Sequence, residues 1–468
     1  MSYALVWFRR DLRLSDNPAL QCALRNGYAP IPVYIHAPEE EGQWAAGAAS
    51  LAWLHRSLVS LDSALRKVGS RLIIRSGPSQ ATLAALVQQL KACAIFWNRR
   101  YEPFARERDR KIKLFFRENG ITVQSFNASL FAEPGSILTR QETPYRVFTP
   151  FWRETSALVG SPNCISAPSL LPEVPEDVES EDVLKKHGAV SWGTGFWEHW
   201  QPGELGADRA LRQFILGALQ GYKKGRDFPD RLGSSHLSPH VHFGEISVKQ
   251  IAKAIASLKK PTLHDDAAAY VRQLGWREFA YYLLFHFPDT PTQNLYSKFD
   301  TFAWRSPSTT ELDAWKYGNT GVPIVDAAMR ALWKTGWMHN RVRMIVASYL
   351  CKHLRAHWHI GARWFWDTLV DADLACNTLG WQWVAGTGAD AAPYFRIFNP
   401  VLQAQRFDPK ATFITQWVPE LAALPVEQRF APWLYPSQLQ HFAPKYPVFP
   451  IVDLDQGRRD ALDAYKNL

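Results

Sequence analysis

The chain has 468 residues, a formal net charge of +9 and 47% hydrophobic residues. This length predicts two or three domains with a sizeable core, and the composition excludes a disordered chain or a fibre. The excess of basic residues is compatible with a polyanionic partner but does not by itself establish one.

Charge and cysteine spacing limit the environment of the chain. No apolar run is long enough to span a membrane, and charged residues from Arg9 onward interrupt any secretory leader. The five cysteines are too far apart for CxxC zinc or compact iron–sulfur patterns. We therefore expect reduced thiols, no membrane association and a cytoplasmic protein.

Apolar runs alternate with helical patterns in the N-terminal third. Strands are predicted at 4–8, 31–36, 71–74, 94–98 and 122–126, with helices at 17–25, 48–68, 80–91 and 106–118. Such alternation predicts a parallel sheet covered by helices on both faces. Arg9-Arg10-Asp11 follows the first strand where a dinucleotide site would have GxGxxG, so this domain is not expected to hold the main cofactor.

The remainder of the chain is a linker followed by helical patterns. Residues 161–181 are rich in proline, serine and acidic side chains, which is typical of a linker. Helices are predicted at 208–220, 246–258, 266–285, 322–334, 339–355 and 361–369. The predicted organisation is an α/β domain over 1–130, a linker over 131–200 and an all-helical domain over 201–468.

A serine-rich stretch precedes one helical segment. The hydroxyls of Ser234, Ser235 and Ser238 at a helix start suit a phosphate group, although ordinary N-capping is the more common explanation of such residues. Histidines nearby have the spacing of metal ligands, but Pro239 and Gly244 interrupt the helix that such ligands would share. No metal site is expected.

Tryptophan is concentrated in the helical part. Ten of the 20 tryptophans lie between Trp276 and Trp383, more than a core requires. Asn377 and Trp381 share a helix face, and polar groups in such an apolar stretch cost free energy unless they bind something. The pattern predicts a buried aromatic cofactor.

Over essentially its whole length, the chain resembles the photolyase/cryptochrome family. The matching stretches are 6–13 with 16–20, 234–239, 276–279, 336–344, 371–383 and 394–400. Residues 242–247 (HFGEIS) and 275–279 (GWREF) are similar to bacterial cyclobutane-dimer photolyases related to plant cryptochromes, the class III subgroup. The resemblance implies a Rossmann-like antenna domain, a helical FAD-binding domain, and light-driven repair of pyrimidine dimers in UV-damaged DNA by a monomer at the bacterial nucleoid.

The resemblance also implies which residues contact FAD. The phosphates and ribityl chain would be held by Tyr222, Ser234, Ser235, Leu237 and Ser238. The isoalloxazine ring would be bordered by Arg343, Asp371, Asp373 and Asn377, with Asn377 at flavin N5. His236 stands where the family usually has arginine.

An electron relay and a lesion pocket are implied in the same way. Trp381, Trp358 and Trp304 resemble the relay from flavin to surface, although packing alone would also explain them. A flipped-out dimer would stack on Trp276 and Trp383 and contact Asn340, Arg341 and Met344. Six-four photolyases have histidine in place of Asn340 and Met344. Phosphate contacts are expected from Lys223, Lys224, Arg226, Arg396 and Lys410.

Two departures from the family pattern leave alternatives open. Gln273 stands where dimer photolyases usually have a catalytic glutamate, and an amide can donate a hydrogen bond but cannot give up a proton. This favours weakened repair or a cryptochrome-like blue-light photoreceptor as the alternative. Phe104-Ala105 replaces the Asn-Glu pair of the better-known folate site after Tyr101-Glu102-Pro103. Methenyltetrahydrofolate in another pose is preferred as the antenna, and the alternatives are a deazaflavin or no antenna.

Overall fold

The computed structural model describes residues 2–159, 162–182, 192–258, 260–390 and 395–468. The chain divides into two compact units. The first, which we call the α/β unit, comprises Met1–Ser191, Trp200–Gly217 and Ser235–Pro288. The second, the helical unit, comprises Trp192–His199, Ala218–Ser234 and Asp289–Leu468. The domain boundaries expected from the sequence stay a prediction.

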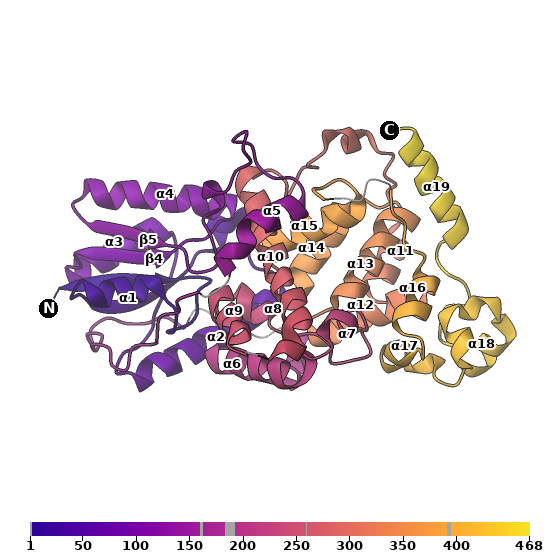
Figure 1. The fold of residues 1–468 in the computed structure, drawn as a ribbon, viewed down its shortest axis with the longest axis horizontal. Coiled ribbons are helices and arrows are strands. Elements are labelled where there is room, and N and C mark those ends of the chain that lie inside the picture. Colours follow the sequence, from indigo (N-terminus) through magenta and orange to yellow (C-terminus); the bar gives the residue numbers. More distant parts are fainter. Residues whose placement is uncertain (1, 160–161, 183–191, 259, 391–394) are drawn as a thin grey trace. The chain divides into compact units, whose positions relative to one another are not determined.

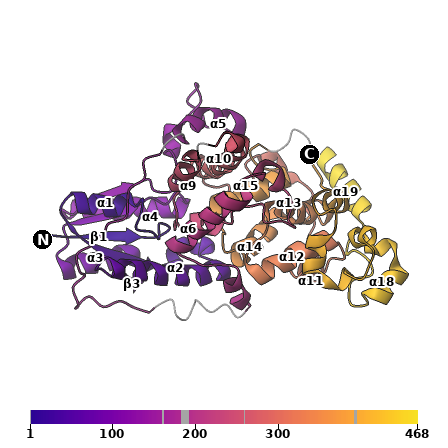
Figure 2. The same cartoon turned by 60° about the horizontal axis from the view of Figure 1, so that its bottom comes forward.

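A five-stranded parallel sheet forms the centre of the α/β unit, with strand order β3-β2-β1-β4-β5 (Figures 1 and 2). The strands are β1 (Tyr3–Phe8), β2 (Ala29–His36), β3 (Ile73–Ser76), β4 (Ala94–Asn98) and β5 (Thr122–Phe126). They alternate with α1 (Pro18–Arg25), α2 (Ala48–Lys67), α3 (Ser79–Leu90) and α4 (Pro103–Glu118). The predicted parallel α/β fold is confirmed.

Apolar side chains from one face of this sheet pack on α3 and α4. Trp7, Val33 and Ile95 lie in one buried cluster with Leu86 of α3 and Phe116 of α4. β1 and β4 are buried at almost every position because helices cover both of their faces. This burial explains why these strands appear in the sequence as uninterrupted apolar runs.

The predicted third strand begins two residues later than expected. Leu72 N–H donates to the Asp62 carboxylate at 2.8 Å and Arg71 donates to the Pro175 carbonyl at 2.8 Å, so both residues are used outside the sheet. The proline-rich segment then covers β3, since Ile74 N–H donates to Ser180 Oγ at 2.9 Å and Ile74 O accepts from Glu181 N–H. The segment therefore shields an edge strand.

Further helices complete the α/β unit. They are α5 (Phe148–Thr155), α6 (Glu204–Gln213), α8 (Ser238–His242), α9 (Val248–Ala256) and α10 (His264–His286). Among the described residues, none of the helices is both long and apolar enough to cross a membrane.

The helical unit packs its helices around one large apolar cluster. Its helices are α7 (Tyr222–Gly225), α11 (Thr309–Lys316), α12 (Pro323–Thr335), α13 (Asn340–Ser348), α14 (Trp358–Thr368), α15 (Leu374–Ala385), α16 (Pro400–Phe407), α17 (Thr412–Trp417), α18 (Pro436–Phe442) and α19 (Leu454–Lys466). Trp315, Trp358 and Trp381 are buried in the cluster. The single helix predicted at 339–355 is instead α13 followed by a π-helical turn at Tyr349–His353.

Candidate functional site

An ion pair joins α13 to the segment that precedes α15. Arg343 Nη2 donates to the two Asp371 carboxylate oxygens at 3.0 and 2.7 Å, and Arg343 Nε donates to the Met338 carbonyl at 2.7 Å. The side chains are 24% exposed for Arg343 and 3% for Asp371. Charge-assisted bonds of this kind fix the guanidinium between the two segments.

Helix α15 positions the next two predicted flavin contacts. Asp373 is its N-cap and accepts the Cys376 N–H at 2.9 Å. Asn377 lies one turn further, and its Nδ2 donates to the Ala362 carbonyl of α14 at 3.0 Å. Helices α13 and α14 both pack on α15, so the polar residues predicted beside the isoalloxazine ring lie on adjoining segments of one unit.

A buried lysine holds the other end of α15. Lys352 Nζ donates to the Ala385 carbonyl at 2.6 Å and lies 3.1 Å from the centre of the Phe395 ring. Burial lowers the pKa of Lys352 to about 7. A cation at a helix C-terminus complements the helix dipole, so Lys352 anchors the helix that carries the predicted flavin contacts.

Phosphate-binding residues are predicted in both units. In the helical unit, Tyr222 begins α7, and Gly233 approaches that helix so closely that a Cβ would lie 2.6 Å from the Gly225 carbonyl oxygen. The hydroxyl oxygen of the adjacent Ser234 is buried with no hydrogen-bond partner among the described residues. A buried orphan hydroxyl fits a site that a polar ligand completes, as the phosphate or ribityl chain of FAD would.

In the α/β unit, the predicted phosphate contacts form a tight local turn. Ser235 Oγ accepts the Leu237 N–H at 3.3 Å, and Ser238 is the first residue of α8. His236 has a positive φ of 53° and its ring centre lies 5.7 Å from that of Trp200. The hydroxyl of Ser235 thus takes part in local capping, while its proton can still be donated to an anion.

The three predicted relay tryptophans lie in the helical unit. Trp381 packs so closely on Gly361 of α14 that a Cβ there would lie 2.0 Å from its ring. Trp358 lies one turn before Gly361 on α14 and donates from Nε1 to Asn294 Oδ1 at 2.8 Å. Trp304 is partly buried against the same core. Trp358 and Gly361 are three residues apart and share a face of α14. Helix α14 therefore contacts Trp381 through Gly361 and carries Trp358 on the same face.

Other tryptophans around this relay were not singled out from the sequence. The buried Trp315 has its ring centre 6.3 Å from that of Trp381. Trp192 stacks on Trp333 at 4.5 Å, and Trp333 stacks on Trp364 at 5.8 Å. Spacing alone could not separate these rings from packing residues, because their contacts come from four different segments.

In the α/β unit, α10 presents Trp276, one of the two predicted lesion-stacking residues. One face of its ring is already covered by Phe148, at a centroid distance of 3.7 Å and an interplanar angle of 10°. Only the opposite face can therefore receive a base. Gln273, one turn earlier, donates from Nε2 to the Ala269 carbonyl at 3.2 Å, so one of its two amide protons is used within the helix.

In the helical unit, α13 begins with three predicted lesion contacts. Asn340 is exposed at the first position, with Nδ2 3.9 Å from Met344 Sδ one turn later. Arg341 pairs with Asp227 at 2.9 Å and lies over the Phe407 ring at 4.2 Å. Asn340 and Met344, four residues apart, therefore share a helix face, whereas Arg341 contacts Asp227 and Phe407.

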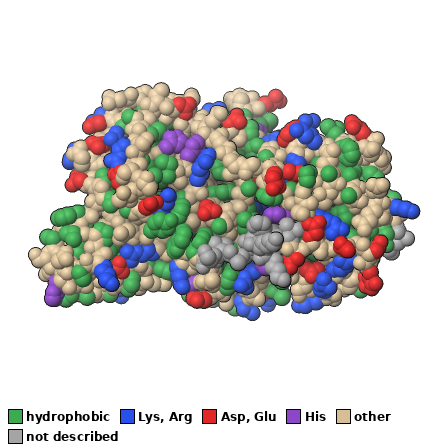
Figure 3. Space-filling model, turned by 180° about the vertical axis from the view of Figure 1, so that it is seen from behind, with side chains coloured by type: hydrophobic (Ala, Val, Ile, Leu, Met, Phe, Trp, Pro, Cys, Tyr) green, Lys and Arg blue, Asp and Glu red, His purple; other side chains and the backbone are tan. Residues whose placement is uncertain are grey.

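The other stacking residue and a basic cavity belong to the same unit. Trp383 donates from Nε1 to the Asp390 carbonyl at 3.0 Å. Arg341, Arg396 and Arg406 border a cavity of about 580 Å³ that Arg458 also lines. By contrast, Figure 3 shows a face where Lys and Arg side chains are interspersed with Asp and Glu. The described cavity is thus a local gathering of positive charge.

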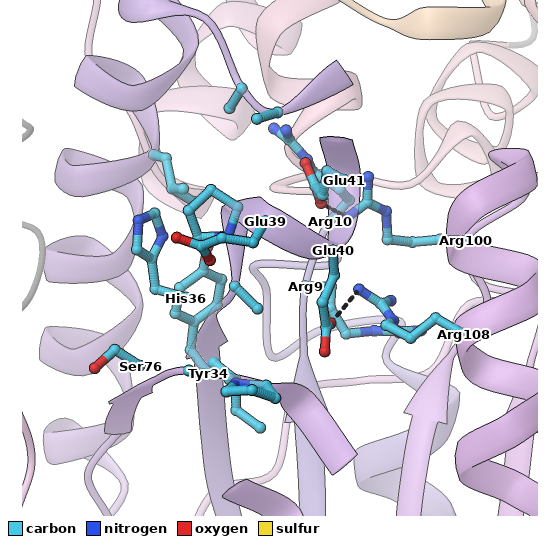
Figure 4. A pocket seen from close by; sticks show the side chains of 18 of the residues that line it. Arg9, Arg10, Tyr34, His36, Glu39, Glu40, Glu41, Ser76, Arg100 and Arg108 are labelled. Atoms are coloured by element: carbon cyan, nitrogen blue, oxygen red, sulfur yellow. Dashed lines mark hydrogen bonds and ion pairs between the residues drawn. The ribbon is translucent and has the colours of Figure 1, made fainter. Parts of the chain in front are cut away.

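The α/β unit has a cavity of about 680 Å³ at the carboxyl ends of β1, β2 and β3 (Figure 4). Two of the four arginines that line it pair with carboxylates of its own wall: Arg100 with Glu41, and Arg108 with Glu40 at 3.5 Å. Tyr34 lines the wall, and burial raises its pKa to about 12. An anionic ligand would have to compete with these carboxylates for the guanidinium groups.

Fold and site together define a class of protein: a parallel α/β unit joined to a helical unit equipped for an aromatic redox cofactor. Models of two families match, "DNA photolyase" at residues 4–172 and "FAD binding domain of DNA photolyase" at residues 270–467. The chain belongs to the photolyase/cryptochrome family.

Named relatives come from both branches of this family. A deoxyribodipyrimidine photo-lyase of Agrobacterium fabrum is 44% identical over 98% of this chain and 97% of its own length. Cryptochrome-1 of Arabidopsis thaliana is 36% identical over 97% of this chain and 69% of its own. The crystal structure of a bacterial class III photolyase from Agrobacterium tumefaciens superposes with a TM-score of 0.94, at 43% identity, covering 100% of this chain and 98% of that one.

Proposed function

We propose that this chain is a deoxyribodipyrimidine photo-lyase that splits UV-induced cyclobutane pyrimidine dimers in DNA. The observation that carries the proposal is the set of groups on α13, α14 and α15: the Arg343–Asp371 pair, Asn377 held by α14, and the buried Trp381. The proposal also rests on the family of the chain, since the DNA photolyase model matches residues 4–172 and the FAD-binding domain model matches residues 270–467.

FAD, when bound, supplies one-electron chemistry driven by blue light. The chain's own residues hold and tune it. The buried Ser234 hydroxyl would bond the phosphate or ribityl part, and the Arg343–Asp371 pair would border the ring with its charge balanced. Asn377 presents an amide, which is neutral and can donate or accept, so it suits a ring in either redox state.

The residues proposed for lesion binding are described in each unit by itself. Trp276 offers one open ring face, since Phe148 covers the other, and a base with little stacking left costs less to extrude. Asn340 and Met344 on one face of α13 are the proposed contacts to the flipped dimer. Gln273 can still donate its second amide proton to a pyrimidine carbonyl, which would orient the dimer without proton transfer.

The test is repair of a thymine-dimer oligonucleotide by purified protein with chemically reduced flavin, in blue light and in darkness. Light-dependent recovery of intact thymines supports the proposal. Gln273→Glu should then raise the repair yield severalfold, because a protonated carboxyl can stabilise charge on the split dimer. No repair by either protein, with flavin bound and photoreducible, would reject the photolyase assignment.

A cryptochrome-like photoreceptor is the second candidate. It is favoured by Gln273 in place of the usual glutamate and by 36% identity with Cryptochrome-1. The oligonucleotide experiment separates the two candidates, because a photoreceptor would photoreduce its flavin without restoring thymines.

We further propose methenyltetrahydrofolate as the antenna, in preference to a deazaflavin. Its cationic bridge suits the cavity of the α/β unit, where the carboxylates of Glu40 and Glu41 line the wall. Ligands of parallel sheets bind at the carboxyl ends of strands, where this cavity opens. Chromophore extraction from wild type and from Glu41→Gln tests both points; full retention in the variant would place the antenna elsewhere.

We also propose that the protein acts as a monomer on nucleoid DNA in the cytoplasm. The basic cavity beside Arg341 would contact backbone phosphates, so DNA affinity should fall steeply as salt rises. Sedimentation with and without damaged duplex would test the monomeric state.

A further inference from the structure

One histidine contacts the rings of two of the proposed relay tryptophans. The His357 ring centre is 5.0 Å from that of Trp304 and 5.7 Å from that of Trp358. A second histidine, His359, lies 3.9 Å from Trp358 and 4.5 Å from His357. Any charge on His357 therefore acts on both indoles at close range.

Hydrogen bonding assigns the uncharged form of His357. It is the N-cap of α14, and its Nδ1 accepts the His359 N–H at 3.3 Å. In this form the proton sits on Nε2, and a second proton on Nδ1 would end the capping contact. Burial lowers the pKa of His357, while Asp300 raises it by a smaller amount.

The charged surroundings come from several elements. Asp300 lies on the 3₁₀ turn at Ser297–Thr301, and Arg363 lies on α14, where it acts on His359. Arg355, two residues before His357, pairs with Asp460 of α19 at 3.7 Å. His359 itself has its pKa lowered to about 4, mainly by burial. Near neutral pH both imidazoles are therefore uncharged.

We propose that His357 is a proton-controlled gate on the electron relay: uncharged it permits the oxidation of Trp358 and then of Trp304, and protonated it blocks both. The inference rests on the proposed function of the tryptophans as a relay. In the gated step one electron moves from Trp358 to the Trp381 radical cation, so Trp381 is reduced and Trp358 is oxidised; an electron from Trp304 then reduces Trp358. FAD, when bound, would supply the oxidant that starts the relay, and no bond or proton changes hands.

The chemistry of Trp304 makes the gate effective. Its buried Nε1 has no hydrogen-bond partner among the described residues. Since no described group accepts a hydrogen bond from Nε1, the oxidised indole has no direct route for losing its proton and keeps its positive charge. A second positive charge about 5 Å away strongly disfavours that state in a partly buried setting.

The test is the initial rate of FAD photoreduction in blue light, with a thiol as external reductant, from pH 8 down to the lowest pH at which the protein stays folded and keeps FAD. In the wild type the rate should fall at least about tenfold as the pH drops through the pKa of His357. His357→Asn keeps a capping side chain without a titratable ring and should show a flat profile. His357→Arg should be slow at every pH, and His264→Asn, at an exposed site, should follow the wild type.

Two further measurements distinguish a failure of the proposed His357 gate from a failure of the proposed tryptophan relay. The pKa of His357, measured by NMR of histidine-labelled protein, should match the midpoint of the photoreduction profile. Repair by chemically reduced protein does not use the relay and should be unaffected in His357→Arg. A wild-type profile that stays flat across the pH range in which NMR shows His357 to titrate, or a midpoint more than about one pH unit from the NMR value, would overturn the gate. Unchanged photoreduction in Trp358→Phe would instead overturn the relay.

Discussion

Gly361 allows Trp381 to rest on α14, which makes Gly361→Ala a sensitive probe of the proposed relay. The added Cβ would lie 2.0 Å from one ring carbon of Trp381 and 2.5 Å from another. Because Trp381 is 3% exposed, its ring cannot move aside without disturbing the core. We expect the ring to shift and flavin photoreduction to slow at least severalfold.

The stability effect has two opposing parts. Overpacking a core costs about 1–3 kcal/mol, whereas replacing glycine by alanine within a helix returns about 1 kcal/mol. Gly380 provides a matched control, because it lies within α15 next to Trp381 yet a Cβ there would meet nothing within 4 Å. Gly380→Ala should gain up to about 1 kcal/mol and photoreduce normally.

Urea unfolding and blue-light photoreduction of both variants form the assay. The difference in unfolding free energy between Gly380→Ala and Gly361→Ala should be about 1–3 kcal/mol. Chemically reduced Gly361→Ala should still repair, since the relay is then bypassed. Equal stability and equal photoreduction in the two variants would refute the reasoning.

Three more predictions follow from contacts in single units. Asp371→Asn should weaken FAD binding at least about tenfold, because Arg343 loses its charge partner, as fluorescence of released flavin would show. Phe148→Leu should weaken dimer binding severalfold, because Trp276 loses the ring that holds it flat. Burial lowers the pKa of His353 to about 4 from its ordinary 6.5, so the unfolded chain binds the extra proton first and stability falls as pH drops from about 6.5 to 4. This loss, up to about 3 kcal/mol, should be absent in His353→Asn.

Each of these has a control. Asp313→Asn, in an exposed pair with Lys316, should leave flavin affinity unchanged. Phe115→Leu, at a surface site, should bind damaged DNA like the wild type. Normal flavin affinity in Asp371→Asn, normal dimer binding in Phe148→Leu, or the same acid slope in His353→Asn would contradict the corresponding prediction.

Local patterns in the sequence predicted the sheet, because each buried strand is a short apolar run. The prediction was wrong where a tertiary contact determines the conformation. Arg71 and Leu72 have a strand-like sequence, but Arg71 donates a hydrogen bond to the linker and Leu72 donates one to α2. The helix expected through 339–355 changes to a π turn where Lys352 reaches the end of α15, which no periodicity shows.

Some contacts in the candidate site could also be predicted from the sequence, and others could not. Asn377 and Trp381 could be placed on one helix face from their spacing, and the structure has them on α15. The ring behind Trp276 could not be predicted, because Phe148 is more than a hundred residues away in sequence. Its only sequence signal is aromatic clustering within 145–152.

The proline-rich segment that bonds to β3 has a practical consequence for dissecting this protein. A fragment ending at residue 130, where the sequence suggests a domain boundary, would lack Ser180 and Glu181 and leave backbone groups of Ile74 open. It would also lack Val174 and Val178, which are buried in the sheet cluster. Such fragments would pair edge to edge and precipitate, so an expressible version of this region has to extend past residue 182.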